Sequence, residues 1–390
     1  MRIVLAGYGS RGDIEPCAAV GRELLCRGHD VRMAVSPHKL DFVESAGVAA
    51  VAYGPDTRER INVATNFVRH VGDPMSALPE VTERVSQVWS EKSATLAQLA
   101  DGADLLVAGM NEQQLATNVA ARYDMPFAAL HFFPAEALDF GPLQSHITNV
   151  AQGVQRDALG LPEATGPSTR QVLEVQAYDA LCVPRLAADW AKEGRRRPFV
   201  GALTLAMPTD ADDEVLAWIA EGTPPIYFGF GSTPVTYPDE TVAVIIAACT
   251  RLGERALICS GPNDFTDLPH PSHVKIVDAV NHGAVFPSCR AVVHHGGAGT
   301  TAAAMRAGVP MLVLWLWLDQ PIWASAVSEL GVGMGRPFSE STLDSLAADL
   351  RCLLSGDYAA RAGEVAAHVT KPAESAAKAA DLLEDAARSG

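Results

Sequence analysis

Residues 294–302, His-His-Gly-Gly-Ala-Gly-Thr-Thr-Ala, combine side chains and spacing that suit the binding of a phosphate group. The apolar residues 291–293 before them predict a strand, and the Ala-rich residues up to 307 predict a helix. Glycines let the backbone approach an anion, and the first N–H groups of a helix lie at the positive end of its dipole. A histidine at the strand end can add a hydrogen bond. The segment predicts a phosphate-binding turn, unless it is only a tight connection.

A second glycine turn, Gly-Tyr-Gly-Ser-Arg-Gly at residues 7–12, follows the apolar residues 3–6. Its G-x-G-x-x-G pattern between a strand and a helix is typical of dinucleotide-binding domains. Those domains place an acidic residue at the end of the second strand, where it binds ribose hydroxyls. Here the second predicted strand, residues 31–35, is followed by Ser-Pro-His, and Asp30 precedes it. Binding of NAD is therefore only an alternative for this turn.

Asp13 stands where this second turn becomes a helix. A carboxylate there can cap the helix N-terminus, and it can equally act as a base toward a ligand at the strand ends. Glu15 lies two positions on, and residues two apart do not share a helix face. The sequence therefore predicts one catalytic carboxylate and not the carboxylate pair of a glycoside hydrolase.

Two further strand ends carry polar residues. Ser232 follows a Gly-Phe-Gly sequence, and its hydroxyl can bond a phosphate oxygen. Asp319 and Gln320 follow a Trp-containing apolar run, and an acid beside an amide suits the binding of sugar hydroxyls. Each has a plain alternative, because strand ends often carry serine and because Asp319 can cap a helix that opens with Pro321.

The elements that must position these residues alternate between strand-like apolar runs and helical segments. The predicted strands are residues 3–6, 31–35, 105–108, 127–131, 226–230, 256–259, 274–277, 291–294 and 311–314. The predicted helices are residues 15–27, 40–46, 112–123, 239–252, 300–307 and 372–388. This order predicts parallel sheets with helices on both faces, in an α/β protein with two doubly wound Rossmann-like domains.

A linker at residues 195–213, rich in charge and proline, separates the two predicted domains. We place an N-terminal domain at 1–207, a C-terminal domain at 208–371, and a C-terminal helix at 372–390 that packs back on the N-terminal domain. Ligands of open α/β sheets lie beyond the carboxyl ends of the strands, so the two domains should face each other across a cleft. Residues 56–77 interrupt the first domain and predict a mobile excursion.

Composition excludes several classes of protein. A chain of 390 residues with 48% hydrophobic and 19% charged residues can bury two cores. The net charge of −16 argues against a nucleic-acid partner, and Arg195, Arg196 and Arg197 are too few to change that. The seven cysteines form no Cys-x-x-Cys pair and no metal-ligand spacing, which favours a reducing cytoplasm. The N-terminus has no signal-peptide core, and the longest apolar run, residues 309–318, is about half the length that spans a bilayer.

Three motifs together resemble the family 1 glycosyltransferases, which have the GT-B fold. In chain order they are Gly9-Ser10-Arg11-Gly12-Asp13-Ile14-Glu15-Pro16, His294-His295-Gly296-Gly297-Ala298-Gly299-Thr300-Thr301 and Asp319-Gln320-Pro321. The chain is similar to the bacterial vancomycin-group and sterol glycosyltransferases, and residues 7–56 look most like actinobacterial, especially mycobacterial, glycopeptidolipid glycosyltransferases. The resemblance covers nearly the whole chain and is strongest at residues 1–55 and 276–335.

The resemblance implies a role for each matching residue. Asp13 would be the general base that takes the proton from the acceptor hydroxyl, and Ser10 would lie beside the reacting centre. His294 matches the phosphate-binding histidine of the family better than His295 does. The set that would bind the donor diphosphate is Ser232, His294, His295, Gly296, Gly297, Ala298, Gly299 and Thr300.

The donor sugar and the nucleobase would be bound by other matching residues. Asp319 and Gln320 would hold the sugar, and the backbone at Val280 would flank the nucleobase. Asn281 stands where related chains often have proline, which is a departure from the family pattern at the base contact.

The implied activity is an inverting, metal-independent transfer of a hexose from a nucleoside-diphosphate sugar to a hydroxyl of an apolar acceptor, with no cofactor. It would take place in the cytoplasm or at the inner face of the membrane. Trp315 and Trp317 favour a 6-deoxyhexose donor such as dTDP-rhamnose over UDP-glucose, unless both rings belong to the core. The excursion and the aromatic residues 132–134 favour a lipopeptide, glycopeptidolipid, macrolide or sterol-like acceptor.

Two other functions stay open on the sequence alone. One is an NAD-dependent oxidoreductase or a sugar-nucleotide epimerase, and the other is a non-catalytic protein that binds sugar nucleotides. The sequence also leaves open the oligomeric state and a peripheral contact with the membrane.

Overall fold

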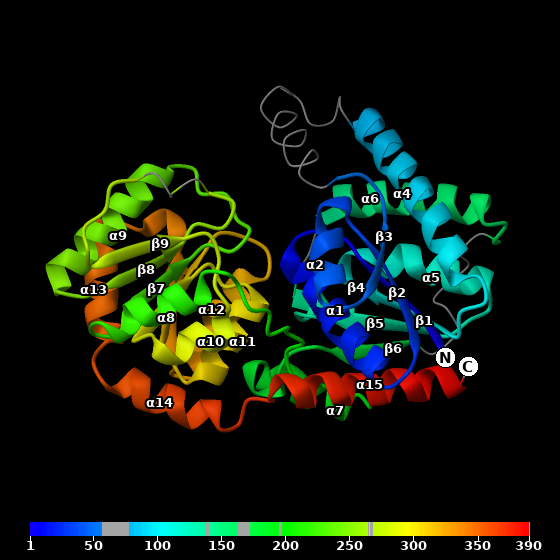
Figure 1. Ribbon diagram of the computed structural model, residues 1–390. Coiled ribbons are helices and arrows are strands. Elements are labelled where there is room, and N and C mark those ends of the chain that lie inside the picture. The colour runs from blue at the N-terminus through cyan, green and yellow to red at the C-terminus, as the bar shows by residue number, and fades with distance from the viewer. Residues whose placement is uncertain are drawn as a thin grey trace. The chain divides into compact units, whose positions relative to one another are not determined.

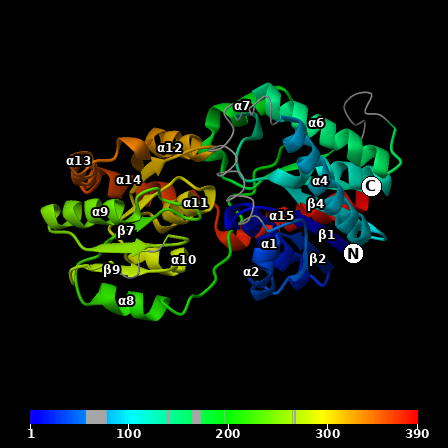
Figure 2. The same ribbon diagram turned by 90° about the horizontal axis from the view of Figure 1, so that it is seen from above.

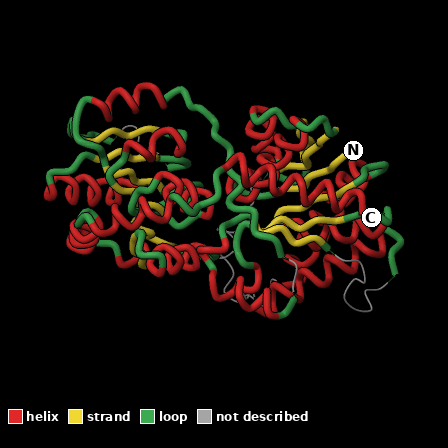
Figure 3. The backbone as a smooth tube through the Cα atoms, turned by 90° about the horizontal axis from the view of Figure 1, so that it is seen from below, coloured by secondary structure: helices red, strands yellow, loops and turns green. Residues whose placement is uncertain are grey.

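The computed structural model describes residues 1–56, 78–137, 141–162, 172–194, 197–263, 265 and 268–389. The chain divides into two compact units. Unit 1 comprises Met1–Ala177, Asp189–Leu205 and Pro372–Gly390, and unit 2 comprises Tyr178–Ala188 and Ala206–Lys371. Both ends of the chain therefore belong to unit 1, as Figure 3 shows.

Unit 1 is built on a six-stranded parallel sheet (Figure 1). Its strands are β1 (Arg2–Gly7), β2 (Asp30–Val35), β3 (Ala49–Ala52), β4 (Leu105–Gly109), β5 (Phe127–His131) and β6 (Leu173–Gln176). They lie in the order β3-β2-β1-β4-β5-β6, and Ile3 of β1 pairs with Val31 of β2 and Leu105 of β4. The winding direction therefore reverses between β1 and β4.

Helices cover both faces of this sheet, because its central strands are apolar on both sides. They are α1 (Arg11–Cys26), α2 (Leu40–Ser45), α4 (Leu78–Ala100), α5 (Gln113–Arg122), α6 (Gly141–Ala158) and α15 (Pro372–Ser389). Leu5 and Val107 belong to the core beneath α1 and α15, whereas Val4 and Leu106 belong to the core beneath α4 and α5. Helix α6 packs on α4.

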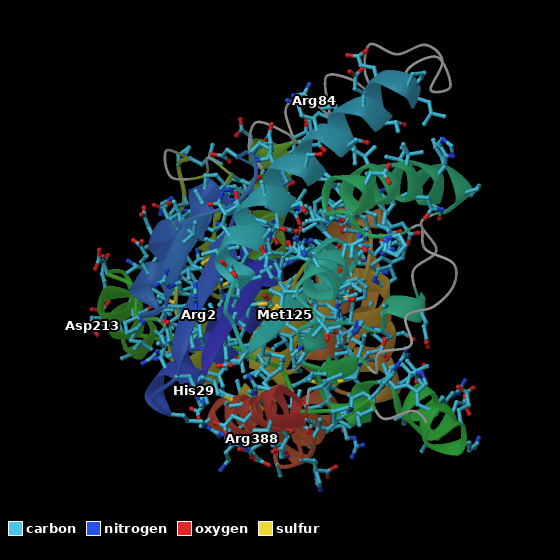
Figure 4. All side chains as sticks on the ribbon, turned by 90° about the vertical axis from the view of Figure 1, so that its right-hand side faces the viewer. Arg2, His29, Arg84, Met125, Asp213 and Arg388 are labelled. Atoms are coloured by element: carbon cyan, nitrogen blue, oxygen red, sulfur yellow. The ribbon has the colours of Figure 1, made fainter. Side chains whose placement is uncertain are left out.

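The C-terminal helix α15 is fixed to unit 1 by a polar network as well as by apolar contacts. Glu384 of α15 accepts a hydrogen bond from His29 at 2.9 Å and pairs with Arg388 at 3.0 Å. Figure 4 shows His29 and Arg388 at the same edge of the unit. Arg27 also bonds Asp381 of α15 at 2.6 Å, so the end of α1 and the start of β2 together anchor the helix.

Unit 2 repeats the plan with a second six-stranded parallel sheet (Figure 2). Its strands are β7 (Ile226–Gly229), β8 (Ala256–Cys259), β9 (Val274–Val277), β10 (Ala291–His294), β11 (Met311–Trp315) and β12 (Gly333–Pro337). They lie in the order β12-β11-β10-β7-β8-β9, and Val293 of β10 pairs with Phe228 of β7 and Leu312 of β11. The winding direction here reverses between β7 and β10.

Helices also cover both faces of the second sheet. They are α8 (Asp212–Ala220), α9 (Pro238–Leu252), α10 (His282–Val285), α11 (Ala298–Ala307), α12 (Gln320–Glu329), α13 (Leu343–Leu353) and α14 (Asp357–Ala366). Ile245 of α9 and Leu350 of α13 pack in one core with Phe228 and Val293 of the sheet. Helix α10 packs with α8 and α11. Among the described residues, no helix is long and apolar enough to cross a membrane.

The structure confirms two doubly wound α/β units. The predicted strands at residues 127–131, 256–259, 274–277 and 291–294 have the observed bounds. Strands β3, β6 and β12 were missed, because they are short, lie at the sheet edges and are only partly buried, which leaves a weak apolar pattern. The excursion beyond Asp56 and two of the three arginines at 195–197 lie outside the described residues.

One segment packs away from the region in which the sequence placed it. Residues 178–188 were assigned with the N-terminal domain, but they lie in unit 2. The buried Asp179 accepts hydrogen bonds from the backbone N–H of Thr370 at 3.0 Å and from its hydroxyl. This long-range contact has no local sequence signal.

Candidate functional site

Each sheet has one point where the winding reverses, and ligands of open α/β sheets bind beyond the strand ends at that point. In unit 1 the point lies between β1 and β4, and the turn after β1, residues 7–13, begins there. In unit 2 it lies between β7 and β10, and the turn after β10, residues 294–300, begins there. We call these the β1 turn and the β10 turn. The topology therefore brings both glycine motifs to the positions where a ligand is expected.

The β10 turn is shaped by a glycine that no other residue replaces easily. Gly296 has a φ of +92°, and a Cβ there would lie 2.8 Å from Cγ1 of Val313. Helix α11 then begins at Ala298, with Gly297 as its N-cap residue and no acidic residue in its first turn. The first N–H groups of α11 therefore have no partner within the helix and lie at the positive end of its dipole. This geometry suits a phosphate group.

His294 contributes a buried hydrogen-bond donor below this turn. Its side chain is fully buried, and Nδ1 accepts the backbone N–H of Gly296 at 3.0 Å. Burial lowers the pKa of His294 well below its usual range, and the neighbouring His295 and His282 lower it further. The ring is therefore neutral, and its proton lies on Nε2 because Nδ1 is an acceptor. This Nε2 atom has no partner among the described residues.

His295 joins the β10 turn to the loop that follows β7. Burial lowers its pKa to about 4. A Cβ added to Gly231 would lie 2.4 Å from its ring, and one added to Gly297 would lie 2.6 Å from it. The imidazole therefore lies between two glycine backbones, and Ser232, which follows Gly231, is exposed. The structure thus brings the loop of Ser232 to residues 294–300.

Asp319 and Gln320 lie beside the same turn, but their side chains are already used. Gln320 is 5% exposed, and its Oε1 accepts the backbone N–H groups of Leu316 at 2.7 Å and Trp317 at 3.2 Å. A carboxylate oxygen of Asp319 accepts the indole N–H of Trp323 at 2.8 Å. These bonds shape the loop, and they leave only part of the polar capacity of the pair for a sugar.

The loop ahead of Asp319 exposes apolar side chains. Trp317 is 52% exposed and Leu318 is 58% exposed, whereas Trp315 is partly buried. Leu318 also has a φ of +53°, which is strained for a residue with a side chain. Trp317 therefore does not belong to the core. Its backbone is bonded to the side chain of Gln320, which packs against Gly296 of the β10 turn.

Val280 lies just before α10, which packs on α11. Its side chain is 5% exposed, which leaves little of that side chain for a ligand. Asn281, which departs from the expected proline, caps α10 through a bond from the N–H of Gly283 to its side chain. Its own N–H donates to Asp212 at 2.8 Å, a bond that proline could not make.

In unit 1 the β1 turn holds a carboxylate by hydrogen bonds. One oxygen of Asp13, Oδ2, accepts the backbone N–H of Ser10 at 2.6 Å and its hydroxyl at 2.7 Å. The helix cap and the candidate base are thus the same residue, because Ser10 and Asp13 form the capping box of α1. A Cβ on Gly9 would lie 2.4 Å from Oδ2, so the turn leaves room for no other residue there.

Asn111 is a site residue that the sequence analysis missed. It lies in a short helical turn, η2 (Met110–Glu112), directly after β4. Its side-chain N–H groups donate to Oδ1 of Asp13 and to the carbonyl of Tyr8, both at 3.0 Å. The strand order would have identified Asn111, because β4 lies beside β1 at the point where the winding reverses, and Asn111 follows β4. That order is not visible in one sequence.

The environment of Asp13 makes it a stronger base than a free aspartate. Burial raises the pKa of Asp13, the bonds from Ser10 and Asn111 oppose this rise, and the charge of Glu112 adds to it. A carboxylate has about four acceptor positions. Ser10 takes two on Oδ2 and Asn111 takes one on Oδ1, which leaves a position on Oδ1 for an incoming hydroxyl.

Other predicted features were also located. The aromatic rings of Phe132 and Phe133 are each 9% exposed and pack edge to face 5.3 Å apart, so they form no open wall. Across the part of the chain that the structure describes, no group of three or more His, Cys, Asp or Glu is placed to hold a metal ion.

Two family models match parts of this chain. A model of the glycosyltransferase family 28 N-terminal domain matches residues 3–99, and a model of the erythromycin biosynthesis protein CIII-like C-terminal domain matches residues 246–384. The first match contains the β1 turn, and the second contains the β10 turn.

Relatives match along the whole chain. An uncharacterized glycosyltransferase of Mycobacterium tuberculosis is 52% identical over 416 residues, covering 100% of this chain and 99% of the relative. Vancomycin aglycone glucosyltransferase of Amycolatopsis orientalis is 31% identical over 421 residues, covering 99% of this chain and 98% of the relative. The crystal structure of glycosyltransferase VinC in complex with dTDP has a TM-score of 0.66 at 20% identity, with 100% of both chains covered, which shows a shared fold. The chain therefore belongs to the family 1 glycosyltransferases and has their two-domain GT-B fold.

Proposed function

We propose that this glycosyltransferase moves a hexose from a nucleoside-diphosphate sugar to a hydroxyl group of an apolar acceptor, with inversion at the anomeric carbon. The observation that carries the proposal is the buried Nε2–H of His294, which has no partner among the described residues and belongs to a ring bonded through Nδ1 to Gly296 of the β10 turn. A buried donor without a partner costs free energy, and a phosphate oxygen would satisfy it.

Unit 2 would bind the leaving group. The diphosphate would accept hydrogen bonds from Nε2 of His294 and from the N–H groups that open α11. Ser232 is exposed and free to add its hydroxyl, whereas the backbone at Val280 would flank the base. Negative charge builds on the diphosphate as the bond to the sugar breaks, and these groups would stabilise it without a metal ion.

Unit 1 would supply the base. The acceptor hydroxyl would donate to the open position on Oδ1 of Asp13, which takes the proton as the acceptor oxygen attacks the anomeric carbon. The bond from that carbon to the diphosphate oxygen breaks in the same step, and its electron pair leaves with the nucleotide. Glu112, whose charge acts on Asp13, is buried and bound by Lys92, so it is not placed to attack the sugar as a nucleophile. A single displacement of this kind inverts the configuration.

We infer a 6-deoxyhexose donor carried by dTDP. The exposed ring of Trp317 beside the β10 turn supports this, because a methyl group at C6 tolerates an apolar wall better than a hydroxymethyl group does. VinC, which shares the fold, was crystallised with dTDP. Equal kcat/KM values for dTDP-rhamnose and UDP-glucose would contradict the preference.

We infer an apolar acceptor, such as a lipopeptide or glycopeptidolipid, from a groove in unit 1. The groove has a volume of about 460 Å³ and lies between α4 and α6, where its lining includes Leu78, Val150 and Val154. Val150 and Val154 are exposed apolar residues of α6, and Leu143 of the same helix is another. The cysteines are free thiols, which supports a location in the reducing cytoplasm. The apolar surface would allow contact with the inner face of the membrane.

The alternative of an NAD-dependent enzyme is not favoured. Asp13 places a negative charge at the N-terminus of α1, where such an enzyme would bind the pyrophosphate. The same carboxylate also accepts the N–H of Ser10 that an anion would need.

A thermal-shift panel with UDP, dTDP, GDP and NAD tests the proposal. A nucleotide at about 100 times its Kd should stabilise the protein by about 2.7 kcal/mol. We expect stabilisation by dTDP or UDP and none by NAD. The anomeric configuration of the product, read by NMR from its coupling constant, then tests inversion. Stabilisation by NAD alone would refute the binding of a sugar nucleotide. A product that retains the donor configuration would refute inversion.

A further inference from the structure

A buried ion pair lies next to the candidate base in unit 1. Lys92 of α4 is 4% exposed and Glu112 is 1% exposed, and Nζ of the lysine bonds Oε1 of the glutamate at 2.5 Å. The second oxygen of Glu112 accepts the hydroxyl of Tyr53 at 2.6 Å. Tyr53 is also fully buried, so the charges are removed from water on every side that the structure describes.

This cluster is joined to Asp13 through the backbone and through aromatic contacts. Glu112 follows Asn111 in η2, and Asn111 bonds Oδ1 of Asp13. Nζ of Lys92 lies 4.1 Å from the centroid of the Tyr8 ring, and Asn111 bonds the carbonyl of the same tyrosine. Glu112 and its partner Lys92 are therefore each one contact away from the groups that orient the base.

Stability alone does not account for such a pair. Removing two charges from water costs about as much as their attraction returns, and apolar replacements of buried ion pairs are often neutral or stabilising. Fixing the η2 turn and setting the local charge are effects that an apolar pair could not reproduce. Because the pair lies next to the residues that bond Asp13, both effects act on the candidate base.

We propose that Glu112, held by Lys92 and Tyr53, is a positioning residue that fixes Asn111 against Asp13 and places a negative charge near the base. The assignment rests on the proposed function of Asp13. Glu112 acts through its neighbours and does not touch the substrate. Its charge favours the protonated form of Asp13, which makes the carboxylate a stronger acceptor for the proton of the hydroxyl.

The sign of the pH effect follows from the groups around Asp13. From α1 and its cap these are Ser10 and the thiol of Cys17, whose pKa is raised to about 12 by burial and which is therefore neutral. From η2 they are Asn111 and Glu112, and from α4 the group is Lys92, whose positive charge is paired with Glu112. Of these, Glu112 raises the pKa of Asp13. The deprotonated base is lost as the pH falls through this raised pKa. Without the charge of Glu112 the pKa falls, so activity should persist to lower pH while the base becomes weaker.

The test compares Glu112→Gln with the neutral pair Lys92→Met/Glu112→Gln and with the control Glu91→Gln, an exposed glutamate next to Lys92 on α4. We expect both test variants to move the acidic limb of kcat/KM downward by about half a pH unit or more and to lower kcat about two- to tenfold. The Kd for dTDP, measured by calorimetry, should not change. The control should match the wild type.

A purely structural role would give a different result. The thermal midpoint would fall while the acidic limb stayed in place, and this outcome would overturn the proposal. A wild-type protein that transfers no sugar from any donor would instead refute the proposed function. The pKa of Asp13 can then be read directly from its ¹³C carboxyl resonance, and equal values in the wild type and in Glu112→Gln would still refute the charge effect. If the variant Lys92→Met/Glu112→Gln fails to fold, Glu112→Asp replaces it. This variant keeps the negative charge, so the acidic limb of its kcat/KM profile must lie at the wild-type pH.

Discussion

The β1 turn and the β10 turn are built alike, but they present opposite chemistry. Each follows a central strand at the point where its sheet reverses its winding, and each contains a glycine with positive φ, Gly9 or Gly296. Each then opens a helix. The third position after the N-cap is Asp13 in α1 and Thr300 in α11. At this equivalent position in the first turn of the helix, α1 carries an acid and α11 does not.

That position decides what the helix N-terminus can bind. In α1 the carboxylate of Asp13 accepts a hydrogen bond from the backbone N–H of Ser10. It also places a negative charge at the positive end of the helix dipole, so an anion is repelled there. In α11 the first turn carries no acid, and the N–H groups remain available to an anion. We therefore propose that one scaffold yields a base in unit 1 and an anion site in unit 2.

The largest effect should come from removing the base. Asp13→Asn keeps the shape and most hydrogen bonds but cannot take a proton, so kcat should fall about 10²- to 10⁴-fold. Turnover of donor and acceptor measures it. Asp41→Asn, which removes an exposed acid from α2, is the control and should keep wild-type turnover. Full activity of Asp13→Asn would remove Asp13 from the mechanism.

The next effect should follow from making the two turns alike. Thr300→Asp places a carboxylate at the position in α11 that Asp13 occupies in α1. Nucleotide affinity should fall about 100-fold, while the helix gains about 0.3–1 kcal/mol from the dipole. Thermal shifts with and without dTDP measure both quantities. Thr300→Asn, which changes the side chain without adding a charge, should lose much less affinity than Thr300→Asp. Unchanged binding by Thr300→Asp would show that α11 does not bind the diphosphate.

A smaller loss should result from removing one donor. His294→Gln deletes the ring whose Nε2 has no partner in the described structure. A hydrogen bond to a charged group contributes about 1.5–3 kcal/mol, so the Kd for dTDP should rise about 10- to 100-fold. Titration calorimetry measures it. The exposed His270→Gln is the control. An unchanged Kd would leave the helix N-terminus alone as the diphosphate site.

The smallest effect concerns the helix that completes unit 1. Bonds from His29 and Arg27 lower the pKa of Glu384 to about 2. Its contribution to stability is therefore present above the unfolded pKa of about 4.5 and is lost as the pH falls toward 2. Glu384→Gln should lower the free energy of unfolding by about 1 kcal/mol at pH 7 and by less at pH 3. Urea unfolding tests this. Glu374→Gln, an exposed residue of the same helix, should cost less than about 0.5 kcal/mol at either pH. A pH-independent difference would contradict the linkage.

How much the sequence predicted depended on how local the signal was. Buried central strands such as β8 and β10 were predicted with their bounds, because continuous apolar residues between turns are a local pattern. Both glycine turns were located for the same reason. Asn111 was not, because its role depends on β4 lying beside β1, which is a matter of strand order.

Asp319 and Gln320, which the sequence predicts to hold the sugar, show the same limit. The bonds of Gln320 to residues 316 and 317 and of Asp319 to Trp323 depend on the path of the loop. The raised pKa of Asp13 likewise depends on burial and on Glu112, ninety-nine positions away. A single sequence does not reveal contacts of this kind.

Calorimetric titration of dTDP into Asp13→Asn tests the division between the two turns most directly. If unit 2 binds the nucleotide and unit 1 supplies only the base, the variant should bind dTDP with a Kd within about twofold of the wild type while it transfers no sugar. A loss of dTDP binding in this variant would mean that the nucleotide depends on the β1 turn, and the central claim would be wrong.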